Sequence, residues 1–413
     1  MLKKIIANSG IQLIGKAIGL VTSLLITALI TRKLGPSNYG LYVFLFAFIN
    51  LMVSFGNWGT QIIGVRELAK SKDKGGVFGS LFSLRLILAC LITFLSLVIV
   101  GSFKIFSDLR LISLISLPLI VAIIVESSFE VVFLSFVKMG IKAKISVFSS
   151  LLFLLLTYLF LKTNLGLLSP ILGWYGSKIF SILLSFFAFK KLIPGKHRVD
   201  KKVVGHLIRE SLPVGALLIL FSVYDQAIDS LVIKNYLGPA QVGLYGLAYK
   251  IYGNLVLPAY FLSNSIFPIL SKNPEKDFTK LLKIGLSLSC LTVLFLIPAV
   301  FFLGKPAVLL IAGRDFAGSA VILRILVPAL LFSYLNHLFG FSLIALNRQT
   351  DSLKIGLLAL FWNLILNLYF IPRTGIIAAA WITVSTEALV TILSFSVLFL
   401  KKSGSRADPV FKA

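Results

Sequence analysis

Charged residues are scarce in this chain of 413 residues: they make up 13%, whereas hydrophobic residues make up 58%. Soluble domains usually carry about a quarter charged residues. The chain has two cysteines, Cys90 and Cys290, and three histidines. Neither a disulfide framework nor a metal cluster is therefore available, and we expect both cysteines to be small core residues. This composition excludes a soluble globular domain.

The sequence motifs of common enzymes and ATPases are also missing. No P-loop, glycine-rich nucleotide fingerprint, H-E-x-x-H motif or nucleophile elbow is present. An ATP-driven pump would therefore have no site for ATP. We expect no cofactor, no metal and no catalytic residue, which leaves transport or channel function.

Apolar runs long enough to cross a bilayer, about 17 to 25 residues each, recur from one end of the chain to the other. We count twelve, which predicts an all-α integral membrane protein. We expect the first helix to be retained, because no cleavage site of a signal peptide follows it. The predicted spans are 9–31, 39–63, 77–101, 109–135, 143–162, 165–189, 211–236, 240–269, 280–304, 318–342, 352–371 and 375–400.

The basic residues predict the orientation of these spans. If the N-terminus is cytoplasmic, 26 of the 40 Lys and Arg residues lie in inner segments and 9 lie in outer loops. An excess of Lys and Arg marks cytoplasmic loops, so both termini are predicted to be cytoplasmic. The net charge of +25 is spread over short loops without a basic domain, which favours anionic lipid headgroups over nucleic acid as the partner.

Two stretches half a chain apart are nearly identical. Residues 34–42 read LGPSNYGLY and residues 237–245 read LGPAQVGLY, with six of nine positions shared. Each falls in a predicted outer hairpin, where Gly and Pro end one helix. The tyrosines that follow, Tyr42 and Tyr245, are predicted to lie in the headgroup layer.

A second pair of similar stretches gives the length of the repeat. The stretches LTYLFLKTNLG and LNLYFIPRTG place Gly166 opposite Gly375, each before the last helix of a set of six. Because six is even, the two copies are predicted to be parallel repeats. The predicted domains are an N-terminal lobe (1–190), a basic cytoplasmic linker (191–210) and a C-terminal lobe (211–413). Val203 and Leu207 give the linker an apolar face, so a short interfacial helix and a plain linker both remain open.

Ten ionisable residues besides His337 fall within the predicted spans. A charge at the bilayer centre costs about 2.5 to 3.5 kcal/mol, so we expect these side chains to face the bundle interior or a watery cavity. Snorkelling to the inner interface is an alternative for Lys16 and Glu130. The ten residues are Lys16, Arg85, Glu126, Glu130, Lys178, Asp225, Asp229, Lys250, Arg324 and Glu387.

Their depths make particular pairs available. With a rise of about 1.5 Å per residue, Arg85 and Glu126 lie at one depth on adjacent helices, and the same holds for Asp225 and Lys250. Asp229 lies one turn from Asp225. Interior ion pairs that only hold helices together remain an alternative to a functional role.

The second pair of similar stretches also relates two charges of opposite sign. Lys178 and Glu387 each lie 12 residues past their matched glycines. The equivalent positions of the two lobes therefore carry an ammonium and a carboxylate. This suits a transporter in which one lobe contacts an anion and the other a cation or proton, although an ion pair between lobes would look the same.

Three stretches give a family resemblance along nearly the whole chain: ITRKLGPSNYGLYVFLFAFINL, DQAIDSLVIKNYLGPAQVGLYGLAYKI and LNRQTDSLKIGLLALFWNLILNLYFIPRTGIIAAAWIT. Their order and spacing resemble the polysaccharide transporters. These are the Wzx-type oligosaccharide-lipid flippases of the multidrug/oligosaccharidyl-lipid/polysaccharide (MOP) exporter superfamily. Twelve spans fit this branch better than the lipid II flippases, which usually carry fourteen.

The resemblance implies a MATE-like pair of six-helix lobes in the cytoplasmic (inner) membrane, with a cavity that opens to one side at a time. It implies a substrate of polyprenyl carrier, phosphate or pyrophosphate, and a short glycan, with glycan-assembly enzymes as candidate partners. The implied substrate-binding residues are Lys16, Lys250, Arg85, Lys178 and Arg324, and the implied ion-coupling residues are Asp225, Asp229, Glu126 and Glu387.

Two other functions stay open. A small-molecule cation antiporter of the same superfamily would favour an acidic cavity, whereas the charges within the spans are five basic and five acidic. A membrane enzyme of glycan assembly is disfavoured by the short outer loops. For the flippase we hypothesise that Asp225 and Lys250 pair when the cavity is empty, and that the lipid phosphate then takes over Lys250 and favours proton uptake by Asp225 or Asp229.

Overall fold

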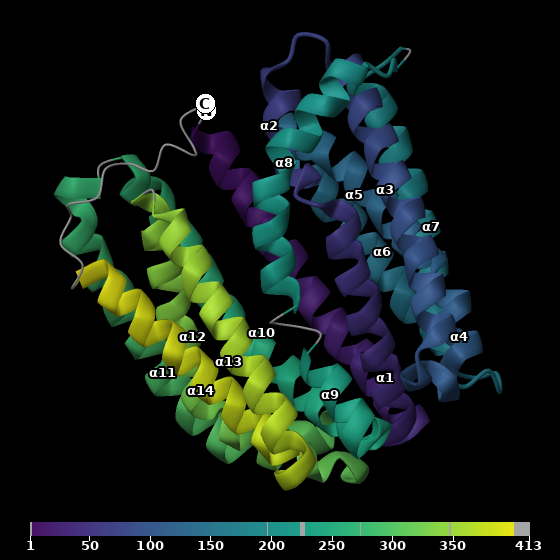
Figure 1. The fold of residues 1–413 in the computed structure, drawn as a ribbon, viewed down its shortest axis with the longest axis vertical. Helices are drawn as coiled ribbons and strands as arrows, with labels where there is room; N and C mark the ends of the chain where they lie inside the picture. Colours follow the sequence, from purple (N-terminus) through teal and green to yellow (C-terminus); the bar gives the residue numbers. More distant parts are fainter. Residues whose placement is uncertain (1, 196, 224–227, 273, 347, 400–413) are drawn as a thin grey trace. The chain divides into compact units, whose positions relative to one another are not determined.

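The computed structural model describes residues 2–195, 197–223, 228–272, 274–346 and 348–399. Within these ranges every regular element is a helix, and no strand is present. The all-α prediction is therefore confirmed. The chain divides into two compact units, Met1–Ala227 and Ile228–Ala413, which Figure 1 shows as bundles of helices.

Ten helices of the described chain are long and apolar enough to cross a membrane. The predicted span 9–31 and most of the span 39–63 fall within a single helix, α1 (Leu2–Asn57), whose backbone leaves the helical conformation at Gly35. Neither α9 (Ile228–Leu237) nor α10 (Pro239–Lys272) is among the ten. The chain is thus a multi-pass helical membrane protein, whereas twelve spans, parallel repeats and cytoplasmic termini stay predictions.

Large apolar side chains on the exposed faces agree with a lipid environment. On α3 (Lys74–Ser102), Ile87 is 66% exposed and Phe94 65% exposed. Apolar surface on this scale is rare in soluble monomers. Cys90 and Cys290 are also exposed, so the prediction of two core cysteines is wrong, because these helix faces turn outward.

The N-terminal unit continues from α1 through seven further helices and a 3-10 turn. The closest neighbours are α1 with α6, α6 with α7, and α5 with both α3 and α7. The remaining elements are α2 (Thr60–Lys70), α3, η1 (Lys104–Leu109), α4 (Arg110–Ser116), α5 (Pro118–Ser135), α6 (Met139–Phe160), α7 (Leu168–Leu192) and α8 (Lys201–Ser222).

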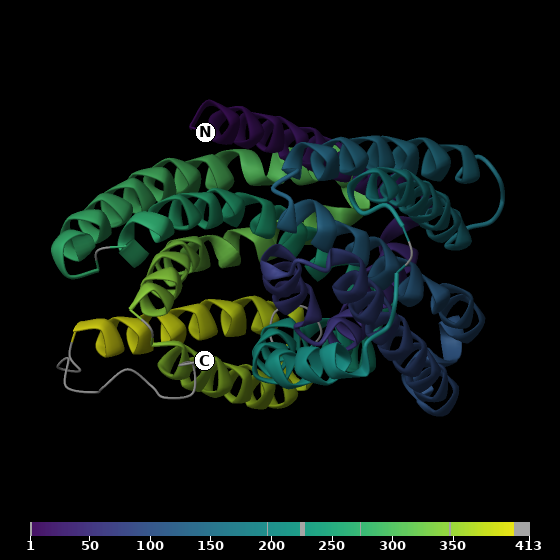
Figure 2. The same cartoon turned by 90° about the horizontal axis from the view of Figure 1, so that it is seen from above.

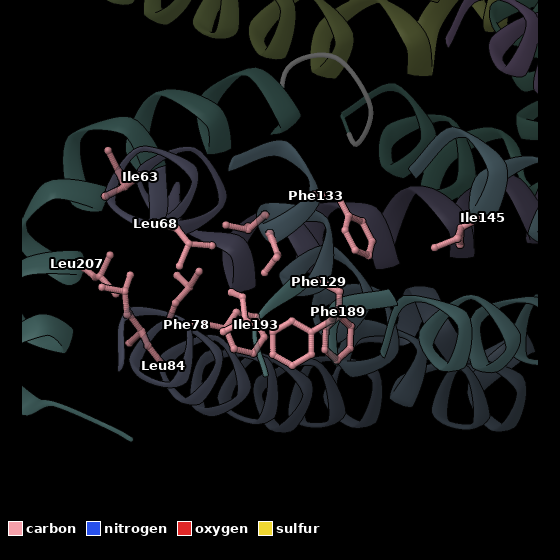
Figure 3. Close-up of a cluster of buried hydrophobic side chains, with 14 residues drawn as sticks. Ile63, Leu68, Phe78, Leu84, Phe129, Phe133, Ile145, Phe189, Ile193 and Leu207 are labelled. Atoms are coloured by element: carbon pink, nitrogen blue, oxygen red, sulfur yellow. The ribbon is translucent and has the colours of Figure 1, made fainter. Parts of the chain in front are cut away.

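The core of this unit is a cluster of aliphatic and aromatic side chains from α2, α3, α5, α6 and α7 (Figure 3). The rings of Phe78 and Phe189 lie 4.3 Å apart between centroids, and Phe129 packs against both. Leu207 of α8 is fully buried in the same cluster. The first turns of α8 are thereby tied to the N-terminal unit.

The second half of the predicted basic linker, residues 201–210, forms the start of the long helix α8, whereas residues 197–200 before it are not helical. The Asp200 side chain caps α8 by accepting a hydrogen bond from the Lys202 nitrogen, and the Asp200 nitrogen donates to Ser80 Oγ at 2.9 Å. The described contacts of α8 include α1, α2 and α3. These contacts extend the N-terminal compact unit beyond residue 190, the end of the predicted N-terminal lobe.

The C-terminal unit is built around α12 (Ala317–Ala345), which packs against α10, α11 and α14. The yellow α14 (Ile376–Phe399) lies beside α13 (Gln349–Thr374) in both views (Figures 1 and 2). The remaining elements are α9, α10, α11 (Pro274–Ala312) and η3 (Arg314–Phe316).

The glycines in both pairs of similar stretches share a left-handed backbone conformation. Gly35, Gly238, Gly166 and Gly375 all have φ between 54° and 87°, a region that favours glycine. The tyrosine prediction was wrong for both rings, because Tyr42 is 9% exposed and Tyr245 is 3% exposed. The hydroxyl of Tyr245 is held inside the unit by Asp229, so this ring is not available to the headgroup layer.

Candidate functional site

A polar pocket of about 300 Å³ lies inside the N-terminal unit. The corner between α1 and α2 contributes amide side chains to it, α5 contributes two carboxylates and a hydroxyl, and α6 and α7 contribute two ammonium groups and two hydroxyls. Its charged and amide lining residues are Asn57, Gln61, Glu126, Glu130, Lys142 and Lys178.

The two carboxylates of the pocket are each bound by an ammonium group. Glu126 accepts hydrogen bonds from Lys178 Nζ and from Ser181 Oγ. Glu130 Oε2 lies 2.7 Å from Lys142 Nζ. The side chains of the first pair are 14% and 23% exposed, and those of the second pair are 24% and 39% exposed. Both ion pairs are therefore accessible from the pocket while being largely enclosed by helices.

Arg85 lies behind the pocket and is fully buried. Its Nη2 atom donates to Asn57 Oδ1 and Ser127 Oγ, each at 2.5 Å. These two acceptors both line the pocket. The predicted depth match between Arg85 and Glu126 therefore does not become an ion pair: Glu126 binds Lys178, and Arg85 positions the amide and hydroxyl beside it.

A second polar cluster lies inside the C-terminal unit, around Asp229 of α9. Asp229 accepts from Tyr245 Oη at 2.5 Å and from Asn367 Nδ2 at 2.9 Å. Asn367 also donates to Asn363 Oδ1 at 2.8 Å, and Tyr245 Oη lies 3.0 Å from Thr383 Oγ1. The cluster joins α9, α10, α13 and α14 and gathers carboxylate, amide and hydroxyl oxygens, which are the ligands that hard cations prefer.

The equivalent charges Lys178 and Glu387 each bind within their own unit. Lys178 binds Glu126, whereas Glu387 Oε2 accepts from Asn336 Nδ2 at 2.7 Å. Thr391 Oγ1 donates to Asn336 Oδ1 and so holds the amide in this orientation. Each unit thus surrounds its own charge with partners from neighbouring helices.

Lys250 of α10 differs from the other half-buried charges. Among the residues that the structure describes, none forms a hydrogen bond or an ion pair with its ammonium group. Its predicted partner Asp225 lies outside the described residues. The hypothesis of an Asp225–Lys250 pair therefore stays a prediction.

Two charges that we expected inside the bundle lie on its surface. Lys16 and Arg324 are both exposed. The Arg324 guanidinium lies over the Phe301 ring, 5.1 Å from its centroid, and donates to the Phe301 carbonyl oxygen at 3.3 Å. Neither side chain is enclosed by the helices around it, so a position in a watery cavity, or snorkelling for Lys16, stays a prediction.

Several polar neighbours of these charges were missed by sequence reasoning, which selected only ionisable groups. Asn363 and Asn367 stand four residues apart in the apolar stretch WNLILNL, and this spacing places both on one helix face. Buried amides in a membrane span are costly and could have been singled out on that ground. Asn57, Gln61 and Ser127 carry no comparable signal. Within the described ranges, no group of three His, Cys, Asp or Glu side chains could hold a metal.

Comparison with known proteins agrees with this architecture. The family described as "Polysaccharide biosynthesis protein" matches residues 1–274. The chain belongs to this family.

Two relatives and two solved structures show how far the likeness extends. An uncharacterized membrane protein of Methanocaldococcus jannaschii is 30% identical over 62% of this chain and 60% of its own length. A probable low-salt glycan biosynthesis flippase of Haloferax volcanii is 25% identical over 40% of this chain and 36% of its own length. The chain thus spans less than two thirds of these relatives.

The structures extend the likeness of fold to nearly the whole chain. Lipid II flippase MurJ in an inward closed conformation has a TM-score of 0.76 at 18% identity, over 95% of this chain and 87% of MurJ. An inward-facing multidrug resistance MATE family transporter of the MOP superfamily has a TM-score of 0.69 at 12% identity, over 95% of this chain and 100% of that transporter. The chain therefore has the fold of these transporters.

Proposed function

We propose that the protein is a flippase, without enzymatic activity, that moves a polyprenyl-(pyro)phosphate-linked oligosaccharide from the cytoplasmic to the outer face of the cell membrane. It would serve surface polysaccharide or glycan biosynthesis and act beside the enzymes that assemble the glycan. The family, a relative named as a glycan biosynthesis flippase and the fold of lipid II flippase MurJ support this proposal. Alternating access of the two compact units would carry the substrate across.

The half-buried Lys250 carries the proposal, since its ammonium group has no partner among the described residues. A cation inside a membrane protein is costly without a counterion, so Lys250 needs a carboxylate, as predicted for Asp225, or an anionic ligand. A phosphate group would supply charge-assisted hydrogen bonds that are about twice as strong as neutral ones. We assign Lys250 to the substrate phosphate.

Asp229 is the ion-coupling residue of the proposal. Its carboxylate is held by a tyrosine hydroxyl and an amide from two other helices. A proton or small cation that binds there would change the contacts among α9, α10 and α13. Ion binding and helix packing would thus be linked, and linkage of this kind is reciprocal.

Deletion of the gene tests the proposal. We expect lipid-linked glycan to accumulate on the cytoplasmic face and surface glycan to be lost. Purified protein in vesicles should also expose an inner-leaflet polyprenyl-phosphate-linked glycan to an added glycosidase. Normal surface glycan in a strain without a second transporter would contradict the proposal, and efflux of small cations without glycan-lipid transport would favour an antiporter.

A further inference from the structure

Lys178 and Glu126 of the N-terminal pocket, which the resemblance assigned to substrate binding and ion coupling, bind each other, and the function proposed above uses neither of them. The charges of the pocket's lining residues are already matched, because Glu126 binds Lys178 and Glu130 binds Lys142, and the guanidinium of Arg85 is buried behind Asn57 and Ser127. An anionic ligand would have to displace a carboxylate from its lysine, and a cationic ligand would have to displace a lysine. A neutral ligand rich in hydroxyl groups can instead hydrogen-bond to the outer sides of both pairs without breaking either one.

Amide and hydroxyl groups of the pocket are placed to form hydrogen bonds with such a ligand. Arg85 occupies Asn57 Oδ1, so the amide nitrogen of Asn57 is the group left to donate. The Gln61 side chain has no hydrogen-bond partner among the described residues, and Ser146 lies exposed at the rim on α6. The pocket therefore offers donors and acceptors side by side, which matches sugar hydroxyls, because each hydroxyl both donates and accepts.

The remaining walls are apolar, and the volume is small. Ile123, Phe133 and Ile145 line the pocket beside the polar groups, and apolar walls with a few placed polar groups are typical of small-molecule sites. A volume of about 300 Å³ lies at the lower end of the range of about 300–1,000 Å³ for such sites. It suits one small moiety rather than a whole lipid-linked glycan.

We infer that this pocket binds an uncharged sugar residue of the transported glycan. The inference rests on the proposed function for the origin of the sugar. Glu130 and Lys142 flank the junction of α5 and α6, which the charge distribution predicts to be cytoplasmic. The pocket would thus lie on the side where the substrate is loaded, and would add recognition of the glycan to recognition of the phosphate.

Ligand-observed saturation-transfer NMR tests sugar binding directly, with the full-length protein in lipid nanodiscs. The probes are the methyl glycosides of glucose, galactose and N-acetylglucosamine, with methyl glucuronide as the charged comparison. We expect transfer to at least one neutral glycoside and weaker or no transfer to the glucuronide. Gln61→Leu should weaken binding by about threefold to tenfold, the loss expected for one or two hydrogen bonds. Ser146→Trp, at the exposed rim, should abolish it by filling the entrance.

Gln349→Leu makes the same chemical change at the start of α13 in the other unit and should leave sugar binding unchanged. No transfer to any neutral glycoside, equal binding by Gln61→Leu and wild type, or stronger binding of the glucuronide would each overturn the inference. Vesicle transport of the lipid-linked glycan separates the two proposals. Transport without sugar binding would contradict the inference that the pocket binds sugar but support the proposed flippase function. Sugar binding without transport would contradict the proposed function but support the inference about the pocket.

Discussion

The two units of the protein stabilise their interior carboxylates with different partners. In the N-terminal unit, Glu126 binds Lys178, and Glu130 binds Lys142. In the C-terminal unit, Asp229 accepts from Tyr245 and Asn367, and Glu387 accepts from Asn336. The donors named here for the C-terminal carboxylates are neutral, and neutral donors stabilise a carboxylate less than an ammonium group does. The N-terminal unit thus fixes its pocket carboxylates with ion pairs, whereas the C-terminal unit places hydroxyl and amide groups around Asp229.

The two units also differ at their glycine corners. Trp58 and Gly59, between α1 and α2, both have positive φ. A Cβ atom on Gly59 would lie 2.7 Å from the Gly215 nitrogen of α8. Gly238, before α10, also has positive φ but has open space around it. The corner beside the polar pocket is therefore packed backbone against backbone, whereas the corner of the C-terminal unit is free of close neighbours.

The largest effect is expected for Gly59→Ala, which adds a backbone clash to the strain of positive φ. We expect it to lower the free energy of unfolding by about 3 kcal/mol, whereas Gly238→Ala should cost about 1 kcal/mol from strain alone. Equilibrium unfolding in nanodiscs measures both values. Equal losses for the two variants would show that the close contact with α8 adds nothing to stability.

A somewhat smaller effect is expected for Glu126→Leu, which leaves the Lys178 ammonium without its partner. Fully buried pairs lose about 3–5 kcal/mol in this way, and because these side chains are partly exposed we expect about 2 kcal/mol. The double variant Glu126→Leu/Lys178→Leu should recover most of the loss. If the double variant loses as much free energy of unfolding as the two single variants together, the ion pair does not stabilise the N-terminal unit.

A smaller loss of stability, with a larger change of function, is expected for Asp229→Asn. The substitution weakens hydrogen bonds from neutral donors, which costs about 1 to 2 kcal/mol. Transport in vesicles should lose its dependence on the ion gradient. Glu130→Gln, in the N-terminal unit, is the comparison variant and should keep that dependence. The assignment of ion coupling to the C-terminal unit fails if Asp229→Asn responds to the gradient as wild type does.

The smallest effect on stability is expected for Lys250→Met. Since none of the described residues binds the ammonium group, its removal should change the free energy of unfolding by less than about 1 kcal/mol. Binding of polyprenyl phosphate should weaken by about tenfold or more, the loss of one charge-assisted contact of about 1.5 to 3 kcal/mol. A variant that loses stability but keeps phosphate binding would show that Lys250 stabilises the fold and does not bind the phosphate.

Sequence reasoning reached the charged residues of both clusters but not the groups that surround them. It selected Arg85, Glu126 and Lys178 because a charge in a membrane span needs an explanation. It then matched Arg85 with Glu126 by depth, whereas the structure pairs Glu126 with Lys178. Asn57 and Gln61 were not selected, because uncharged polar residues near the end of a span carry no comparable cost.

The sequence by itself determined that the protein is a helical membrane protein with charges inside its bundles. Long apolar runs leave no other choice, since each backbone group in a bilayer must be bonded within its own segment. The tertiary structure alone decided which charges meet. Depth along a helix follows from counting residues, but the rotation of each helix about its axis depends on the packing of all its neighbours. That rotation brought Lys178 to Glu126, left Lys16 and Arg324 exposed, and placed Asp229 between Tyr245 and Asn367.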